Sequence, residues 1–299
     1  MPVDRAVFSK LDNVGLVVAD LGAAEKYYES IGMGPFVPIP ERLSRAEGLK
    51  TSRAMVGGTG LELIEPGTGD TIWREFLEKN GEGLMHLGFA SDDISKGEAE
   101  CRGAGLRPLY HAEFEGGGTV GFDAREHGGT IFELTKYPQG TVGGLAGSGL
   151  PYSYIHHVGF VMRDVDAAVA YFEGLGFGPF GPLKLSGERT ERTVYGKPAT
   201  YKLKNSGAHI GGTKVELEFL QPLENAPIQE EFLDRRGEGA NHFGFKVAGV
   251  DAETEKLQQK GFGVIFTVRF TSGTVCKYID TRGRGGMLVE FWQPPDDKA

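Results

Sequence analysis

Two histidines and two glutamates stand at matching places in the second half of the chain, and their side chains suit a divalent metal ion. His157 and His242 each begin a run typical of a β-strand. Glu218 and Glu290 lie within the apolar runs VELEF and MLVEF, where an ionised carboxylate is costly unless it is paired or bound to a metal. Two imidazoles and two carboxylates are suitable donors for Zn, Co, Ni, Mn or Fe. The four residues therefore predict a metal site.

The equivalent places in the first half carry a related but altered set. They hold Asn13, Glu62, His86 and Glu133, so Asn13 stands where the second half has its first histidine. An amide is a poor ligand for late transition metals, and we expect at most a weaker second site here. The sequence thus predicts one divalent ion per chain, or two if the first half also binds one.

These equivalences rest on an internal repeat. Residues 14–36 and 158–180 are identical at 12 of 23 aligned positions, and the segments 81–89 and 129–138 reappear at 237–245 and 286–295. We predict one domain over 8–137, a Gly-rich linker over 138–151 and a second domain over 152–295. The spacing grows by 12 residues between Phe180 and Gly237. We expect this insertion of the second copy near residues 204–214.

Each half is itself doubled, because residues 157–178 can be aligned with 242–263. Alternating side chains over 158–163 predict a strand, and Asp164 is a typical N-cap for a helix that ends at Gly176. Short strand-like runs follow, such as residues 214–220. The pattern predicts an α+β fold made of four β-α-β-β-β modules.

Composition excludes several classes of partner. The chain has 299 residues, with 32 basic and 41 acidic side chains and a net charge of −9. Nucleic-acid binding needs clustered Lys and Arg, which we do not find, and no apolar run reaches the ~18 residues of a membrane span. The start of the sequence resembles no signal peptide, and two cysteines are too few for a disulfide framework. We expect a cytoplasmic protein with a small-molecule substrate.

Three segments of each half resemble a known superfamily. They are ELIEP, TIWREFLEKNGEGLMHLGF and GTIFELTKYP in the first half, and ELEFLQP, APIQEEFLDRRGEGANHFGF and GMLVEFW in the second. Together they are similar to the vicinal oxygen chelate superfamily, which includes glyoxalase I, methylmalonyl-CoA epimerase and extradiol dioxygenases. Each half most resembles methylmalonyl-CoA epimerase. The resemblance implies two half-open barrels and places the family's four metal ligands at His157, Glu218, His242 and Glu290.

The same resemblance implies three kinds of function. The first is a metal-dependent isomerase, epimerase or lyase that stabilises an enolate-type intermediate next to a carbonyl, with Glu290 or Glu218 as the catalytic base. The second is an Fe(II) dioxygenase of the extradiol or hydroxyphenylpyruvate type, with His157, His242 and Glu290 as ligands. The third is a non-catalytic binding or resistance protein. A tandem chain is expected to be a monomer or a homodimer.

Residues around the expected barrel mouths suggest three substrate classes, an acyl-CoA, a hemithioacetal or an aromatic compound. Cations that could bind acyl-CoA phosphates follow the first helix of each half: Arg42, Arg45, Lys50 and Arg53, then Lys184, Arg189, Arg192 and Lys197. Aromatic side chains that would suit an aromatic substrate are Tyr195, Tyr201, Phe219, Phe270 and Phe291. The strand alternation turns His156 away from His157, so we expect it at the surface or behind the metal site.

Overall fold

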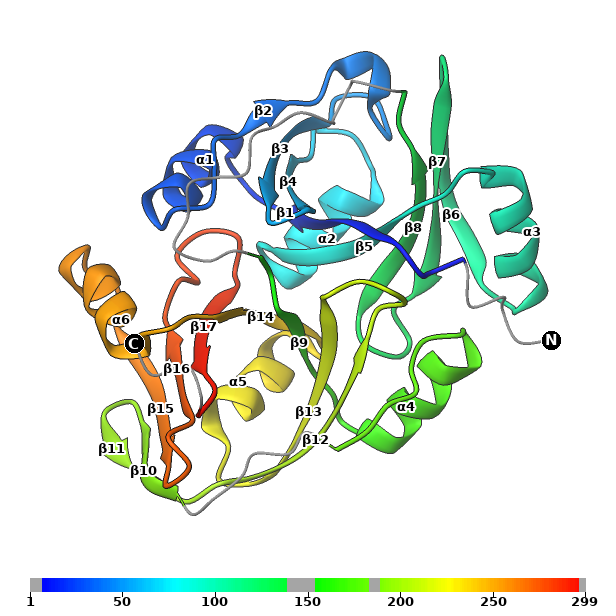
Figure 1. The fold of residues 1–299 in the computed structure, drawn as a ribbon. Helices are drawn as coiled ribbons and strands as arrows, with labels where there is room; N and C mark the ends of the chain where they lie inside the picture. The colour runs from blue at the N-terminus through cyan, green and yellow to red at the C-terminus, as the bar shows by residue number, and fades with distance from the viewer. Residues whose placement is uncertain (1–6, 139–153, 183–188, 296–299) are drawn as a thin grey trace.

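The computed structural model describes residues 7–138, 154–182 and 189–295. They form two curled β-sheets, one from each half of the chain, which lie one above the other in Figure 1. The predicted linker at 138–151, apart from its first residue, and Lys184 lie outside the described residues. The predicted α+β class and the tandem arrangement of half-barrels are confirmed.

The first sheet has eight strands in the order β2-β3-β4-β1-β5-β8-β7-β6. Its strands are β1 (Leu11–Val17), β2 (Val37–Pro38), β3 (Lys50–Val56), β4 (Thr59–Glu65), β5 (Gly83–Ala90), β6 (Arg107–Phe114), β7 (Gly117–Ala124) and β8 (Thr130–Lys136). The central strands β1 and β5 are antiparallel, and each has a parallel neighbour on its other side, β4 and β8. The sheet therefore places the first and last strands of both modules side by side.

The second sheet repeats this centre with nine strands in the order β11-β10-β15-β16-β17-β14-β9-β13-β12. Its strands are β9 (His157–Val161), β10 (Arg189–Val194), β11 (Lys197–Pro198), β12 (Lys202–His209), β13 (Glu216–Glu224), β14 (Gly239–Lys246), β15 (Val264–Phe270), β16 (Val275–Ile279) and β17 (Leu288–Gln293). Here β9 and β14 are the antiparallel central pair, with β13 and β17 as their parallel neighbours.

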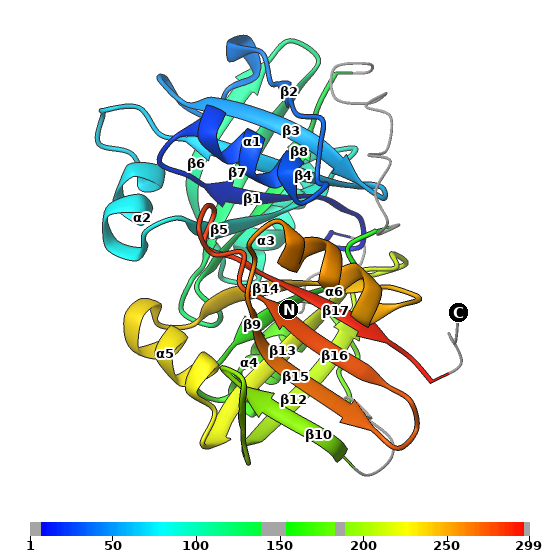
Figure 2. The ribbon, with the colours of Figure 1, turned by 90° about the vertical axis from the view of Figure 1, so that its left-hand side faces the viewer.

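The described residues form six α-helices, which cover the sheets (Figure 2). They are α1 (Leu21–Ser30), α2 (Ile72–Asn80), α3 (Ile94–Gly103), α4 (Val165–Gly174), α5 (Pro227–Arg236) and α6 (Val250–Gln259), and a short 3-10 helix spans Glu41–Leu43. The predicted N-cap Asp164 accepts hydrogen bonds from two backbone N–H groups at the start of α4. No helix among the described residues has the length and apolar character needed to cross a membrane.

The largest difference between the two halves is a hairpin, and it does not lie where the sequence suggested. The segment 202–209 forms β12, which pairs with β13 as β3 pairs with β4 in the first half. The addition is instead the hairpin of β10 and β11, which crosses to the opposite edge of the sheet and pairs with β15. Most of the insertion therefore precedes β12 and does not lie at 204–214 as expected, although the turn between β12 and β13 is longer than that between β3 and β4. The hairpin extends the wall of the second half-barrel.

One hydrophobic cluster joins the two halves. The ring of Phe8 stacks on that of Phe177 at 5.2 Å between centroids, and Phe132 meets Phe172 edge-on at 5.5 Å. All four side chains belong to the same buried cluster, which contains residues from both sheets. Burial of this aromatic surface holds the half-barrels against each other.

Candidate metal site and its first-half counterpart

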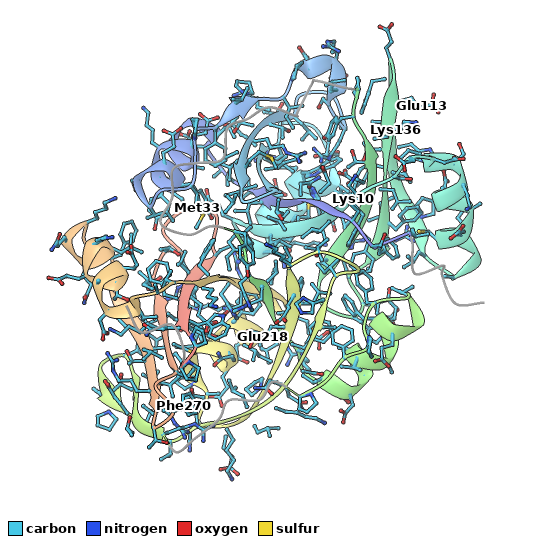
Figure 3. All side chains as sticks on the ribbon, in the orientation of Figure 1. Lys10, Met33, Glu113, Lys136, Glu218 and Phe270 are labelled. Carbon is cyan, nitrogen blue, oxygen red and sulfur yellow. The ribbon has the colours of Figure 1, made fainter. Side chains whose placement is uncertain are left out.

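Four side chains from the four central strands of the second sheet converge on one point. His157 begins β9, Glu218 lies in β13, His242 in β14 and Glu290 in β17. One donor atom from each lies within 4.8 Å of the other three. The sequence predicted these four residues as metal ligands. They lie close together because β13, β9, β14 and β17 are neighbours in the sheet, although they are distant in sequence. Figure 3 labels Glu218 inside the second half.

The spacing of the donor atoms fits a metal ion. Nε2 of His242 lies 3.2 Å from Nε2 of His157, 3.0 Å from Oε2 of Glu218 and 3.1 Å from Oε2 of Glu290. Nε2 of His157 lies 3.0 Å from Glu290 Oε2 and 3.5 Å from Glu218 Oε2. Around an ion bound at about 2.1 Å, neighbouring donors of an octahedron are roughly 3.0 Å apart and those of a tetrahedron roughly 3.4 Å. The four residues present therefore suit a divalent ion in both identity and separation.

A glycine opposite each histidine makes room for its ring. On the antiparallel strands β9 and β14, the ring of His157 lies over Gly244 and that of His242 lies over Gly159. A Cβ atom on either glycine would overlap the ring. These glycines were not predicted as part of the site, although the repeated patterns HVG at 157–159 and HFG at 242–244 signal them.

The Nδ1 atoms of His157 and His242 contact neighbouring side chains outside the cluster. Nδ1 of His242 lies 3.3 Å from Oδ1 of Asn241, and Nδ1 of His157 lies 3.1 Å from Nδ1 of His156. Because the amide oxygen only accepts, His242 donates from Nδ1, so its Nε2 faces the cluster and would bind a metal through the lone pair left when the Nε2 proton is displaced. His156 is half-buried and contacts the predicted ligand rather than joining the cluster. Asn241 was not predicted from the sequence.

Charge is distributed unevenly over the cluster. Burial disfavours the imidazolium of His242, but the hydrogen bonds and charges of Glu218 and Glu290 outweigh this and raise its pKa to about 9. Burial likewise disfavours ionised Glu290, yet His157 and His242 hold the pKa of that carboxyl well below its usual range. Glu290 also accepts a hydrogen bond from the Cys276 thiol, whose pKa is raised, first by burial and then by the charge of Glu290. The site thus favours an ionised Glu290 beside a positively charged His242.

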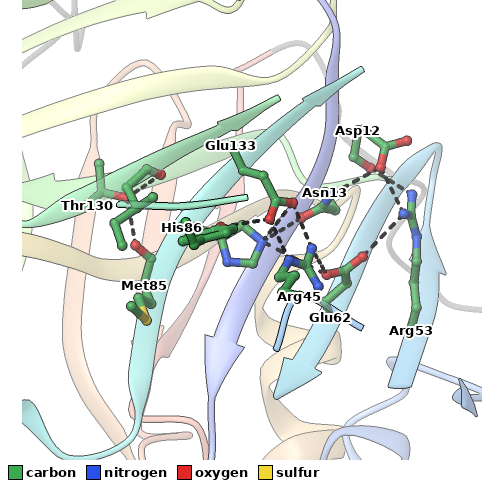
Figure 4. A network of polar contacts seen from close by, with 11 residues as sticks. Asp12, Asn13, Arg45, Arg53, Glu62, Met85, His86, Thr130 and Glu133 are labelled. Carbon is green, nitrogen blue, oxygen red and sulfur yellow. Dashed lines mark hydrogen bonds and ion pairs between the residues drawn. The ribbon is translucent and has the colours of Figure 1, made fainter. Parts of the chain in front are cut away.

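In the first half, a guanidinium provides that positive charge (Figure 4). Arg45 Nη2 donates to Glu62 Oε2 and to Glu133 Oε1, both at 2.7 Å, while its Nε donates to Glu133 Oε2. All three side chains are buried. Nε2 of His86 lies 2.9 Å from Oδ1 of Asn13, so His86 faces the amide rather than a free centre. Asn13, Glu62, His86 and Glu133 are thus brought together as expected, but around Arg45.

Arg45 and Arg53 are therefore not available to phosphates. Arg53 is also buried, 2.8 Å from Asp12 and 3.4 Å from Glu62, and the exposed Lys50 pairs with Glu65. The expectation that Arg45 and Arg53 bind an acyl-CoA at the barrel mouth was wrong, because buried carboxylates hold both inside the barrel. Nothing in the alternating pattern of the sequence signalled Arg45, which comes from a loop.

The aromatic set also needs correction. Phe219 and Phe291 alternate with Glu218 and Glu290 along their strands, so they point to the other face and are fully buried in the main core. Tyr195 lies 45 % exposed beyond the end of β10. Tyr201 and Phe270 line a pocket in the second half.

The comparisons with known proteins agree with this fold. A profile of the Glyoxalase/Bleomycin resistance protein/Dioxygenase superfamily matches residues 12–122 and 156–277. An uncharacterised protein, YqjC of Bacillus subtilis, is 31 % identical over 88 residues, which are 29 % of this chain and 61 % of that relative. The matched segment therefore spans less than two thirds of that protein.

Solved structures of similar fold cover almost the whole chain. A mutant 4-hydroxymandelate synthase from Streptomyces coelicolor gives a TM-score of 0.67 at 14 % identity, covering 98 % of this chain and 93 % of that one. The halotolerant catechol dioxygenase BphC gives 0.55 at 15 % identity, covering 96 % and 87 %. The chain belongs to the Glyoxalase/Bleomycin resistance protein/Dioxygenase superfamily, as a two-domain member. Most enzymes of this superfamily depend on a divalent metal.

Proposed function

We propose that this chain is a divalent-metal-dependent enzyme that moves a proton next to a substrate carbonyl, as an isomerase, epimerase or lyase. The position of Glu218 carries the proposal, because its Oε2 lies 3.0 Å from Nε2 of His242 and faces the same point as Glu290. With Glu218 among the donors, four protein groups leave two positions of a six-coordinate ion, enough for two neighbouring oxygens of one substrate. The ion would stabilise negative charge on the substrate oxygen as a Lewis acid.

Glu218 is the better candidate for the catalytic base. Its side chain is 16 % exposed, against 9 % for Glu290, and its contacts with the cluster are with the two imidazoles. Glu290 is held by both imidazoles and by the Cys276 thiol. Glu218 can therefore turn toward a substrate, take the proton from the carbon next to the carbonyl and return it, while Glu290 keeps its place. The epimerase-like segments make acyl-CoA thioesters the first substrates to test, and hemithioacetals the second.

The test compares Glu218→Gln with Glu216→Gln. Glu216 lies on the same strand but pairs with His209 outside the cluster. We expect about one divalent ion per chain by elemental analysis of anaerobically purified protein. Solvent deuterium should enter the carbon next to the carbonyl with wild type and E216Q, and more than about 100-fold more slowly with E218Q, which keeps its metal. Undiminished exchange in E218Q would contradict the assignment.

An Fe(II) dioxygenase is the second candidate. Without Glu218, the residues His157, His242 and Glu290 form the two-histidine, one-carboxylate set of non-haem iron oxygenases. An aromatic wall beside the cluster favours this alternative, since the ring of Tyr278 lies 4.9 Å from that of His242. Bound iron, with uptake of O₂ in the presence of catechols or arylpyruvates by wild type and Glu218→Ala alike, would replace the first proposal. Metal-dependent binding of these compounds without turnover would instead favour a non-catalytic binding protein.

A further inference from the structure

The second half-barrel also contains a pocket of about 470 Å³, which is bounded by β10, β12 and β15. The side chains that matter for its chemistry are those of Arg189, Arg192, Tyr201, Lys202, Glu224 and Phe270. Figure 3 labels Phe270 near the outer edge of the half that holds Glu218. Rings and guanidinium groups lie next to each other around this pocket.

A row of aromatic rings connects the pocket to the metal-site cluster. From His242, the ring of Tyr278 is 4.9 Å away, that of Phe266 a further 5.0 Å and that of Tyr201 a further 5.4 Å. The guanidinium carbon of Arg192 then lies 4.6 Å from the centre of the Tyr201 ring. The cluster and the arginines thus lie at the two ends of one row of packed rings, in which Tyr278 and Phe266 are buried and Tyr201 lines the pocket.

The two arginines lack an acidic partner among the described residues. Arg192 donates from Nη1 to the backbone oxygen of Tyr201 at 2.6 Å, and Arg189 lies over the ring of Phe270 at 5.5 Å. Burial and the charge of Arg189 lower the pKa of Arg192. Lys202, on the same pocket, is by contrast paired with Glu224 at 2.7 Å. Two neighbouring cations with no acidic partner in the part of the chain that the structure describes form a site for an anion.

The arginines are also specific to this half of the molecule. Both lie in β10, which belongs to the hairpin that has no counterpart in the first sheet. Arg192 pairs with Val268 and Val194 with Phe266, so β10 adds its side chains directly to the wall of the pocket. The inserted hairpin therefore adds cations only where the complete cluster is present.

We propose that this pocket binds an anionic group, a carboxylate or a phosphate, at the end of the substrate remote from the four-residue cluster. The substrate would carry two neighbouring oxygens at one end, a planar body that follows the row of rings and the anionic group between Arg189 and Arg192. This inference rests on the proposed function for the role of the cluster. The anion site itself depends on residues outside that cluster and can be tested separately.

The test is calorimetric titration of the metal-loaded protein with benzoate, phenyl phosphate and the neutral analogue benzamide. We expect benzoate or phenyl phosphate to bind saturably and benzamide not to bind. The preferred anion distinguishes a carboxylate substrate from a phosphate-bearing one. Arg192→Gln should weaken binding at least about tenfold, because a charged hydrogen bond is lost, and Arg192→Lys should restore part of the affinity. Lys202→Gln, whose lysine is already paired, is the matched control.

Two outcomes overturn the anion site, and both are independent of the catalytic proposal. One is equal affinity of wild type and the double variant Arg189→Gln/Arg192→Gln for both anions. The other is binding of benzamide as tight as that of benzoate. Glu218→Gln should retain the anion affinity although it loses proton transfer. Failure of proton transfer with intact, arginine-dependent anion binding would therefore contradict the proposed function and leave the anion site standing.

Discussion

The imidazole of His242 lies directly over Gly159 on the neighbouring antiparallel strand, and a side chain at residue 159 would occupy the space of the ring. The same relationship joins His86 to Gly15 in the first half. The glycines thus fix where the rings lie, because only a residue without Cβ lets a ring lie flat across the strand.

This relationship predicts the effect of Gly159→Ala. The added methyl group displaces His242 from the cluster, so we expect metal affinity to fall by about 10- to 100-fold, as for other changes that misplace a ligand. Overpacking should also destabilise the fold by about 1–3 kcal/mol. Metal titration and urea unfolding measure the two effects. Gly15→Ala is the control, since it should cost similar stability and leave metal binding unchanged. Equal loss of metal in both variants would contradict the specific role of Gly159.

A second prediction concerns the residue behind His242. Asn241→Leu removes the acceptor for Nδ1, and we expect metal affinity to fall about 10- to 100-fold with the fold retained. The absorption spectrum of the Co²⁺-loaded protein should change as well, because the ring is no longer held. Met85 takes the place of Asn241 in the first half, where Nδ1 of His86 is buried without a partner. Met85→Asn should leave metal affinity unaltered. Unchanged affinity in N241L would refute the role of this hydrogen bond.

Local patterns in the sequence account for much of the fold. Alternation predicted the strand at β9, and an aspartate followed by a helical pattern predicted α4, whose cap Asp164 is matched by Asp20 and Asp93 at α1 and α3. The four cluster residues could be found because the repeat places them at equivalent strand positions. These features depend on near neighbours along the chain.

Features set by distant contacts could not be predicted. Arg45 reaches Glu133, 88 positions away, from a loop that has no periodic pattern. The hairpin of β10 and β11 pairs with β15 across the sheet, although the chain next enters β12 on the other edge. Neither contact follows from strand alternation or helix capping. The first depends on a buried carboxylate and the second on an unpaired sheet edge, and both exist only in the folded chain.

The pKa of His242 predicts how metal binding depends on pH. Since this pKa is raised from 6.5 to about 9, the metal-free protein holds a proton on His242 that metal must displace. The protonated imidazole therefore stabilises the metal-free fold fully below pH 6.5, and this stabilisation is lost as pH rises toward 9. Between these two pH values, metal affinity rises by up to about tenfold per pH unit. Calorimetry in buffers of different ionisation enthalpy should detect proton release at neutral pH and none well above pH 9. Absence of release at neutral pH would contradict a protonated His242.

The last prediction concerns Arg45 as the cation of the first half. Arg45→Met leaves Glu133 buried without a guanidinium partner, while Glu62 keeps Arg53 at 3.4 Å. We expect a loss of about 3–5 kcal/mol in the free energy of unfolding, measured in urea. Glu133→Gln added to that variant should recover part of the loss, because one unpaired charge is removed.

Arg45→Ala combined with Asn13→His should raise the metal content from about one to about two ions per chain, because it restores the donor set of the second half. A folded double variant that still binds one ion would show that Arg45 is not what separates the two sites.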